Sequence, residues 1–151
     1  MKIVSERITL DTSGNGDFLD ITDNVARSLA KSGLRAGYVL VFVAGSTAGI
    51  TTFEYEPGLV ADLKEFLQRM APTGKHYHHD DTWGDANGFS HVRASFIGPS
   101  LTVPFERSNL LLGTCSRSCS RNSTTGLDTE RSLCRSSGND HFSKQESPSA
   151  S

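Results

Sequence analysis

Apolar residues recur along the first 113 residues with two different periods, and these periods predict the secondary structure. Alternating apolar and polar residues, or a short run rich in β-branched and aromatic residues, are typical of a β-strand. The segments with these patterns are residues 2–10, 37–44, 50–55, 91–97, 101–105 and 109–113. The run GYVLVFVA at 37–44 is continuously apolar and predicts a central strand that is buried on both faces.

Two other segments have the spacing of an amphipathic helix. The first has its apolar face at Ile21, Val25 and Leu29, and Gly33 is expected to end it. The second begins at Pro57 and stops before Pro72, because the residue that precedes a proline disfavours the helical conformation. Strands outnumber helices, and the later strands are joined by short turns. We therefore expect an α+β fold, a mostly antiparallel sheet or sandwich with two helices.

The pattern ends at Thr114. From there to Ser151 serine dominates, arginines are scattered, and no apolar period of 2 or 3.6 residues remains. Such a segment buries too little apolar surface to offset the entropy lost on ordering, about 1–2 kcal/mol per residue. We expect residues 1–114 to form one domain and residues 115–151 to be a tail outside it.

The charge, the apolar runs and the positions of the cysteines indicate which classes of binding partner the protein has. The net charge is −2 and the isoelectric point is about 6.2, which argues against a nucleic-acid partner. No apolar run approaches the roughly 18 residues of a membrane span, and the charged first residues lack the core of a signal peptide. All three cysteines follow Thr114, and a cysteine-free scaffold fits a cytoplasmic protein. We expect no membrane partner.

Ligand-type side chains are densest between Tyr77 and His91, in the run YHHDDTWGDANGFSH. Within this run, His79 and His91 are the best candidates for a metal or phosphate site. Neutral imidazole binds divalent metals, and protonated imidazole pairs with phosphate. Asp81 or Asp85 would complete a mixed nitrogen and oxygen site, for which we take Asp85 as the third metal ligand.

Other polar side chains are candidates for substrate binding. The Asn87 carboxamide offers both a donor and an acceptor to a ring or a phosphate. Ser46 and Thr47 lie between two predicted strands beside glycines, where hydroxyl and backbone N–H groups can hold an anion. Glu54, at a strand end, is a candidate base or metal ligand. The remaining candidates are Arg93 for a phosphate and Trp83 as a platform for a pyrimidine. For each, the alternative is an ordinary solvated or packing role.

The run FVAGSTAGITTFEYEP at 42–57 and the run YHHDDTWGDANGFSHVRAS at 77–95 resemble the YjbQ-like family, also called secondary thiamine-phosphate synthase enzymes. GPSLTVP at 98–104 and LLLGT at 110–114 continue the resemblance, which covers residues 1–114. It implies the YjbQ-like α+β fold, a homotrimer and weak thiamine-phosphate synthase activity. This transferase reaction of thiamine biosynthesis joins hydroxymethylpyrimidine diphosphate to a thiazole phosphate and releases pyrophosphate.

The resemblance also implies roles for the candidate residues. His91, His79 and Glu54 become the expected catalytic residues, with a divalent metal ion, Mg²⁺ or Zn²⁺, as cofactor and a small phosphorylated metabolite as partner. The alternatives are a side activity of a protein with another role, a non-catalytic protein that binds a metal or an anionic metabolite, and an inactive truncated product.

Three departures from the family pattern are visible. Gly45 and Phe89 stand where family members often carry histidine. Relatives also continue Leu-Gly-Thr into Trp-Gln-Gln and two closing strands, whereas this chain continues into Cys115-Ser116-Arg117-Ser118. Because pattern and resemblance are lost at the same residue, we expect the tail to be either disordered or the product of a reading-frame shift.

Overall fold

The computed structural model describes residues 1–14, 16–113, 117–122 and 130–139, the last two ranges by their backbone. The elements in chain order are β1 (Lys2–Leu10), β2 (Asp17–Asp20), α1 (Thr22–Ser32), β3 (Ala36–Val43), β4 (Ala48–Phe53), α2 (Pro57–Met70), α3 (His78–Trp83), α4 (Gly88–Ile97), β5 (Ser100–Glu106), β6 (Asn109–Leu110), β7 (Arg117–Asn122) and β8 (Glu130–Asn139).

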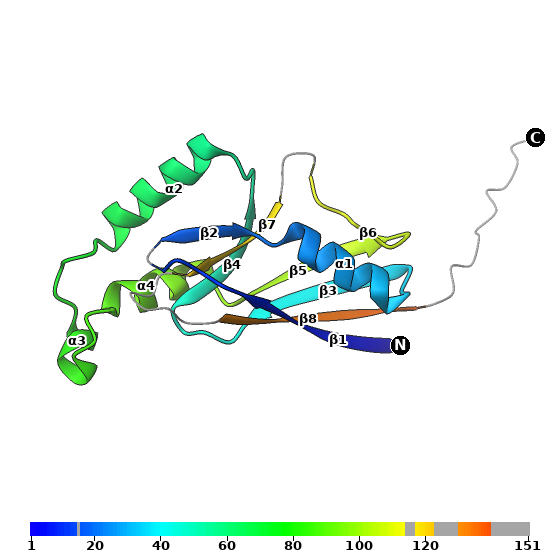
Figure 1. Ribbon diagram of the computed structural model, residues 1–151, viewed down its shortest axis with the longest axis horizontal. Coiled ribbons are helices and arrows are strands. Elements are labelled where there is room, and N and C mark those ends of the chain that lie inside the picture. The colour runs from blue at the N-terminus through cyan, green and yellow to red at the C-terminus, as the bar shows by residue number, and fades with distance from the viewer. Residues whose placement is uncertain (15, 114–116, 123–129, 140–151) are drawn as a thin grey trace, which may run out of the picture.

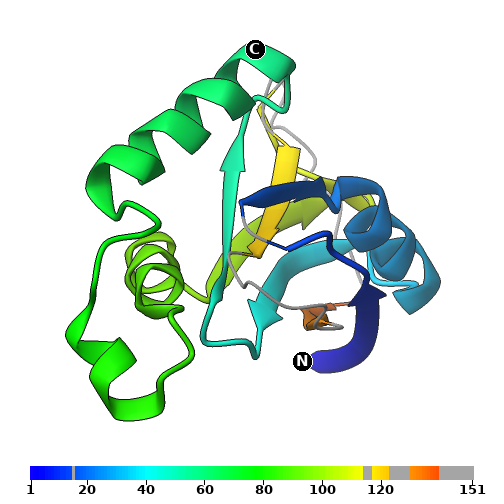
Figure 2. The same ribbon diagram turned by 60° about the vertical axis from the view of Figure 1, so that its left-hand side comes forward.

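The strands form two antiparallel sheets. The larger sheet has the order β1-β8-β3-β5-β6, and the smaller has the order β2-β7-β4. Figure 1 shows α1 lying over the larger sheet, with α2, α3 and α4 gathered at the other end of the molecule. Figure 2 shows the same separation from a second direction. The predicted α+β class with antiparallel sheets is confirmed, but the described residues contain four helices rather than two.

The core lies between α1 and one face of the larger sheet. The predicted apolar face of α1 is confirmed, because Ile21, Val25 and Leu29 are all fully buried in one cluster with residues of β3. Gly33 ends the helix as expected, with φ of 70° in the left-handed region that glycine adopts at little cost.

Only one face of β3 is buried within the chain. Val39, Val41 and Val43 point into the core. On the opposite face, the exposed fractions of Tyr38, Leu40 and Phe42 are 61%, 38% and 38%. The predicted burial of both faces is therefore wrong for the isolated chain. The apolar run at 37–44 predicted correctly that this strand has apolar side chains on both faces. Hydropathy alone does not show which part of the protein, or which other molecule, packs against each face.

The predicted strand at 91–97 is wrong, because these residues belong to α4. The buried residues of this helix recur at helical spacing and are Gly88, Phe89, Ser90, Arg93 and Ala94. Val92 and Phe96, which alternate with Ala94 in the sequence, are exposed instead. The alternation that predicted a strand was therefore a coincidence within a longer helical pattern that begins at Gly88.

α4 is held close against β4. A Cβ atom on Gly49 would lie 2.6 Å from Ile97 Cγ2, so only glycine permits this approach. The Ile50 N–H also donates a hydrogen bond to the Gly98 carbonyl at 2.9 Å. These contacts fix α4 beside the turn between β3 and β4.

α2 agrees with its predicted bounds. Its N-cap, Glu56, accepts hydrogen bonds from the backbone of Gly58 and Leu59. β6 is shorter than the predicted strand at 109–113 and lies at the edge of the larger sheet. Within the described part of the chain, no helix combines the length and apolarity that a membrane span requires.

Two segments of the predicted tail are strands. β8 pairs with both β1 and β3, and β7 pairs with both β2 and β4. Over 117–122 and 130–139 the expectation of disorder is therefore not met. The hydrogen bonds between strands join backbone C=O groups, which every residue has, to backbone N–H groups, which every residue except proline has. A sequence of polar residues can therefore still form a strand. The frameshift hypothesis and the domain boundary at residue 114 stay predictions, and resequencing the coding DNA tests the former. Residues 115, 116, 123–129 and 140–151 lie outside the described residues.

Candidate functional site

A pocket of about 330 Å³ lies where the β3–β4 turn meets α3, α4 and the segment between them. Its lining residues are Ser46, Thr47, His79, Trp83, Asp85, Asn87 and His91. All seven were candidate site residues on the basis of the sequence. The structure thus brings together seven of the nine candidates from two separate stretches of the chain, whereas their chemical roles stay predictions.

The two helices present one histidine each. His79 is at the start of α3, which ends at Gly84 in the left-handed conformation with φ of 71°. His91 lies in the first turns of α4, which follows the N-cap Asn87. The ring centroids of the two histidines are 4.2 Å apart, and the ring planes are tilted by 46°. Most of the polar stretch from Tyr77 to His91 is therefore helical, which gives both imidazoles fixed positions.

Asp85 and Asn87 complete the polar wall. Asn87 Nδ2 donates a hydrogen bond of 2.7 Å to Asp85 Oδ2, and Asp85 Oδ1 lies 4.0 Å from His79 Nε2. In the described residues, His79 Nε2 and Asn87 Oδ1 are buried without a hydrogen-bond partner from the protein. Such a group costs about 1–3 kcal/mol when it stays unpaired. A bound molecule that offers complementary polar groups would therefore be stabilised here.

The pocket favours the uncharged form of His91. Burial lowers the pKa of His91 below its ordinary 6.5, and the nearby His79 lowers it further, while Asp85 opposes the shift more weakly. Neutral imidazole can accept a proton or a hydrogen bond at neutral pH. The lining residues include no lysine or arginine, and Asp85 is the one acidic side chain among them.

The predicted metal ligands do not form a three-residue group. Across the described residues, no three His, Cys, Asp or Glu side chains are close enough together to hold a metal ion. His79, His91 and Asp85 line the same pocket, but Asp85 is bonded to Asn87 and is 4.0 Å from His79. The residues as arranged do not fit a three-ligand site, so we derive no step through a resident metal. The metal requirement itself stays a prediction.

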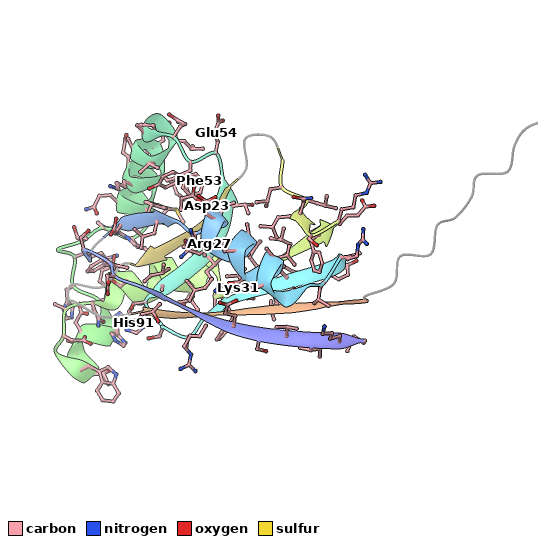
Figure 3. All side chains as sticks on the ribbon, turned by 45° about the vertical axis from the view of Figure 1, so that its right-hand side comes forward. Asp23, Arg27, Lys31, Phe53, Glu54 and His91 are labelled. Atoms are coloured by element: carbon pink, nitrogen blue, oxygen red, sulfur yellow. The ribbon has the colours of Figure 1, made fainter. Side chains whose placement is uncertain are left out.

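Glu54 is outside the pocket. It follows the last residue of β4, whereas Ser46 and Thr47 precede the first. Figure 3 shows Glu54 at the top of the molecule and His91 in its lower left part, and Glu54 is not among the lining residues of the pocket. Within one chain, Glu54 therefore cannot act on a molecule that contacts His91.

Arg93 is also outside the pocket and has a structural role. Its side chain is only 3% exposed. Its Nε donates to the Ala71 carbonyl and an Nη atom donates to Gln68 Oε1, both at 2.8 Å, while the guanidinium lies 5.0 Å from the Phe89 ring centroid. Arg93 therefore ties α4 to the end of α2, and it is not proposed to bind phosphate. Strand periodicity hid this role, whereas helical periodicity from Gly88 places Arg93 on the buried face.

Sequence reasoning gave no role to Asp80, whose carboxylate accepts hydrogen bonds from the N–H groups of Tyr77 and Gly88. The signal was its place three residues after Tyr77, where an acidic residue commonly accepts from the backbone at the start of a helix. His76 and His78 lie outside the pocket, with nitrogen atoms 3.0 Å and 4.0 Å from the Asp81 carboxylate.

Comparison with known proteins identifies the family. The family model described as UPF0047 protein YjbQ-like matches residues 6–120. The chain belongs to the YjbQ-like family. The match extends past the limit of 114 expected from the sequence and ends within β7.

Curated YjbQ-like relatives agree with this match. A UPF0047 protein of Archaeoglobus fulgidus is 38% identical over 110 residues, which are 73% of this chain and 83% of the relative. A UPF0047 protein of Methanothermobacter thermautotrophicus is 35% identical over 114 residues, which are 76% of this chain and 78% of the relative. The names of both relatives state the family and no activity.

Solved structures of YjbQ-like relatives have the same fold. A YbjQ-like protein of unknown function from Sulfolobus solfataricus has a TM-score of 0.84 at 27% identity, covering 91% of this chain and 99% of its own. A hypothetical protein from Aeropyrum pernix has a TM-score of 0.81 at 28% identity, covering 90% of this chain and 99% of its own.

Proposed function

We propose that the pocket binds an amino-substituted pyrimidine ring and that the chain carries out a thiamine-phosphate synthase-type transfer on it. The observation that carries this proposal is the convergence of His79, Asn87 and His91 on one pocket. The reaction type comes from the family resemblance, and the polar groups and size of the pocket support the ring as its occupant.

The wall offers groups that suit such a ring. Trp83 is 73% exposed at the pocket, so its indole is free to stack on a planar ligand. The unpartnered Asn87 Oδ1 is an acceptor for an exocyclic amino group. A volume of about 330 Å³ lies at the small end of ligand pockets, which span about 300–1,000 Å³. One ring with its substituents fits this space better than two complete substrates.

The charges in the pocket suit the chemistry at the ring. The bond between the ring methylene and the diphosphate oxygen breaks, and its electron pair leaves with pyrophosphate. The lone pair of the thiazole nitrogen then forms the new carbon–nitrogen bond. Positive charge develops on the pyrimidine in between, and the Asp85 carboxylate and neutral His91 stabilise it without competition from lysine or arginine. The diphosphate, which these residues do not neutralise, enters as its magnesium complex.

The small volume also favours a second candidate, a non-catalytic protein that holds a metabolite in the same pocket. Both candidates predict that the pyrimidine alone binds, and only the first predicts turnover. Calorimetry with the unphosphorylated hydroxymethylpyrimidine measures binding, whereas pyrophosphate release from the diphosphate in the presence of thiazole phosphate measures transfer.

The decisive comparison uses His91→Ala, His79→Ala and the matched control His78→Ala. His78 neighbours His79 on α3 but lies outside the pocket. We expect the two pocket variants to reduce kcat/KM for pyrophosphate release about 10²-fold or more, and the control to match wild type. Equal activity in all four proteins would place the reaction elsewhere. Binding of the ring without turnover by wild type would leave the binding protein as the function.

A further inference from the structure

The carboxylate of Asp80 joins the first residues of two helices. Its Oδ2 accepts a hydrogen bond from the N–H of Tyr77, the N-cap of α3, at 3.0 Å. Its Oδ1 accepts from the N–H of Gly88, the first residue of α4, also at 3.0 Å. An amide at the start of a helix has no partner within that helix. One side chain therefore satisfies such amides in both helices.

The junction between α3 and α4 is close-packed around this carboxylate. A Cβ atom on Gly88 would lie 2.5 Å from Tyr77 Cβ and 2.9 Å from Asp80 Oδ1. Any other residue at this position would push the two helix starts apart. The two backbone hydrogen bonds also hold the pKa of Asp80 below its ordinary 3.8, so the carboxylate stays ionised at neutral pH and accepts at both oxygens.

This junction connects the two helices that carry the imidazoles of the pocket. Asp80 immediately follows His79 on α3, and Gly88 begins the helix that carries His91. A hydrogen bond from the Tyr77 N–H to Asp80 alone would be an ordinary helix cap, which stabilises α3 without affecting α4. The bond to Gly88 crosses to the second helix and therefore sets the position of one histidine relative to the other.

We propose that Asp80 is a positioning residue of the pocket, whose carboxylate fixes His79 against His91 by bonding the backbone at the start of both α3 and α4. The effect on turnover rests on the proposed function. The clamp itself does not, because it can be measured in the absence of substrate.

The test compares Asp80→Asn with Asp81→Asn. Both replace a carboxylate on α3 by its amide and remove one negative charge. The carboxamide in Asp80→Asn would retain a single acceptor oxygen and lose one of the two bonds, whereas Asp81 contacts the exposed His76 at 3.0 Å and lies outside the pocket. The readout is the nuclear Overhauser cross-peak between the ring protons of His79 and His91, which requires the rings to stay in contact.

We expect the cross-peak in wild type and in Asp81→Asn, and its loss in Asp80→Asn. Its persistence in Asp80→Asn, or its loss in both variants, would overturn the proposal. If transfer activity is found, kcat should fall in Asp80→Asn and stay at the wild-type value in Asp81→Asn. If no activity is found, the cross-peak comparison still decides the positioning role.

A second measurement uses the wild-type protein alone. It therefore tests the proposal even if Asp80→Asn does not fold. The Gly88 amide has no acceptor within α4, so its protection from hydrogen exchange depends on Asp80. We expect the Gly88 amide of wild type to exchange much more slowly at neutral pH than an exposed loop amide such as that of Gly74. Equal rates would mean that the bond is not maintained in solution, and the clamp would be rejected.

Discussion

The imidazoles of His79 and His91 lie 4.2 Å apart between ring centroids, although the two residues belong to different helices. At this separation, a proton on one ring raises the free energy of a proton on the other. Burial, and after it the nearby His79, lower the pKa of His91, so the His91 ring is held in its neutral form.

This relationship predicts how stability depends on pH. The pKa of His91 in the folded chain lies below its ordinary 6.5, so between these two values the unfolded chain binds more protons than the folded chain. The contribution of His91 to stability is fully present above 6.5 and is lost as pH falls through the folded pKa. Urea unfolding of wild type and His91→Gln in EDTA, between about pH 5 and 8, measures it. The stability difference between them should shift in favour of wild type as pH rises, and a constant difference would contradict the prediction.

Arg93→Ala should destabilise the fold. The change leaves the Ala71 carbonyl and Gln68 without their partner and empties a buried volume beside Phe89. We expect a loss of about 2–4 kcal/mol in the free energy of unfolding, measured with urea. The control is Arg69→Ala, whose exposed ion pair with Glu65 should contribute no more than about 0.5 kcal/mol. Equal losses in the two variants would refute the structural role of Arg93.

The sequence predicted most of the sheet and the members of the pocket, because both depend on local patterns. The strands at 2–10 and 101–105 have the alternation that a half-buried strand requires, and His79, Asn87 and His91 belong to one unusually polar stretch. The α4 helix was missed because Val92, Ala94 and Phe96 also alternate. Only long-range packing of Phe89 and Arg93 shows which period is real.

The roles of Glu54, Arg93 and the C-terminal segments depend on contacts that no local pattern contains. Glu54 and Ser46 are close in sequence, but β4 lies between them, so the two residues are at opposite ends of this extended strand. The positions of β7 and β8 are set by backbone pairing with distant strands, and their serine-rich sequence gives no apolar period that would reveal it.

The exposed face of β3 bears on the predicted homotrimer. Tyr38, Leu40 and Phe42 present apolar surface on the side of the sheet away from α1, where another copy of the chain would cover it. We expect Leu40→Glu to lower the mass measured by sedimentation equilibrium from that of a trimer towards that of a monomer. The control is Ala26→Glu, at an exposed position of α1, which should leave the mass unchanged. A monomeric wild type would show that the homotrimer prediction is wrong.

Chelation should separate ring binding from turnover. The lining residues include no lysine or arginine, so the leaving pyrophosphate depends on a cation that accompanies the substrate. We expect EDTA to abolish pyrophosphate release and excess Mg²⁺ to restore it. Calorimetric binding of the unphosphorylated pyrimidine should be unchanged by either treatment. Loss of ring binding in EDTA would instead support the resident metal expected at His79, His91 and Asp85.

Two truncations test the strands of the tail. A chain that ends after Gly113 lacks β7 and β8, which leaves β1 without a partner strand and one edge of β3 unpaired. It should aggregate and show no cooperative thermal transition, because unpaired strand edges associate with other chains. A chain that ends after Asn139 retains both strands and is the matched control. A cooperative transition in the shorter chain would show that the closing strands are dispensable.

The place of β8 between β1 and β3 also constrains the order of events during synthesis. Among the described strands, β1 comes earliest in the chain, and its partner in the sheet, β8, comes last, with Lys2 paired opposite Gly138. β1 therefore stays without this partner until β8 has been made. Such late, distant pairing slows folding and prolongs the time during which unpaired strand edges can aggregate.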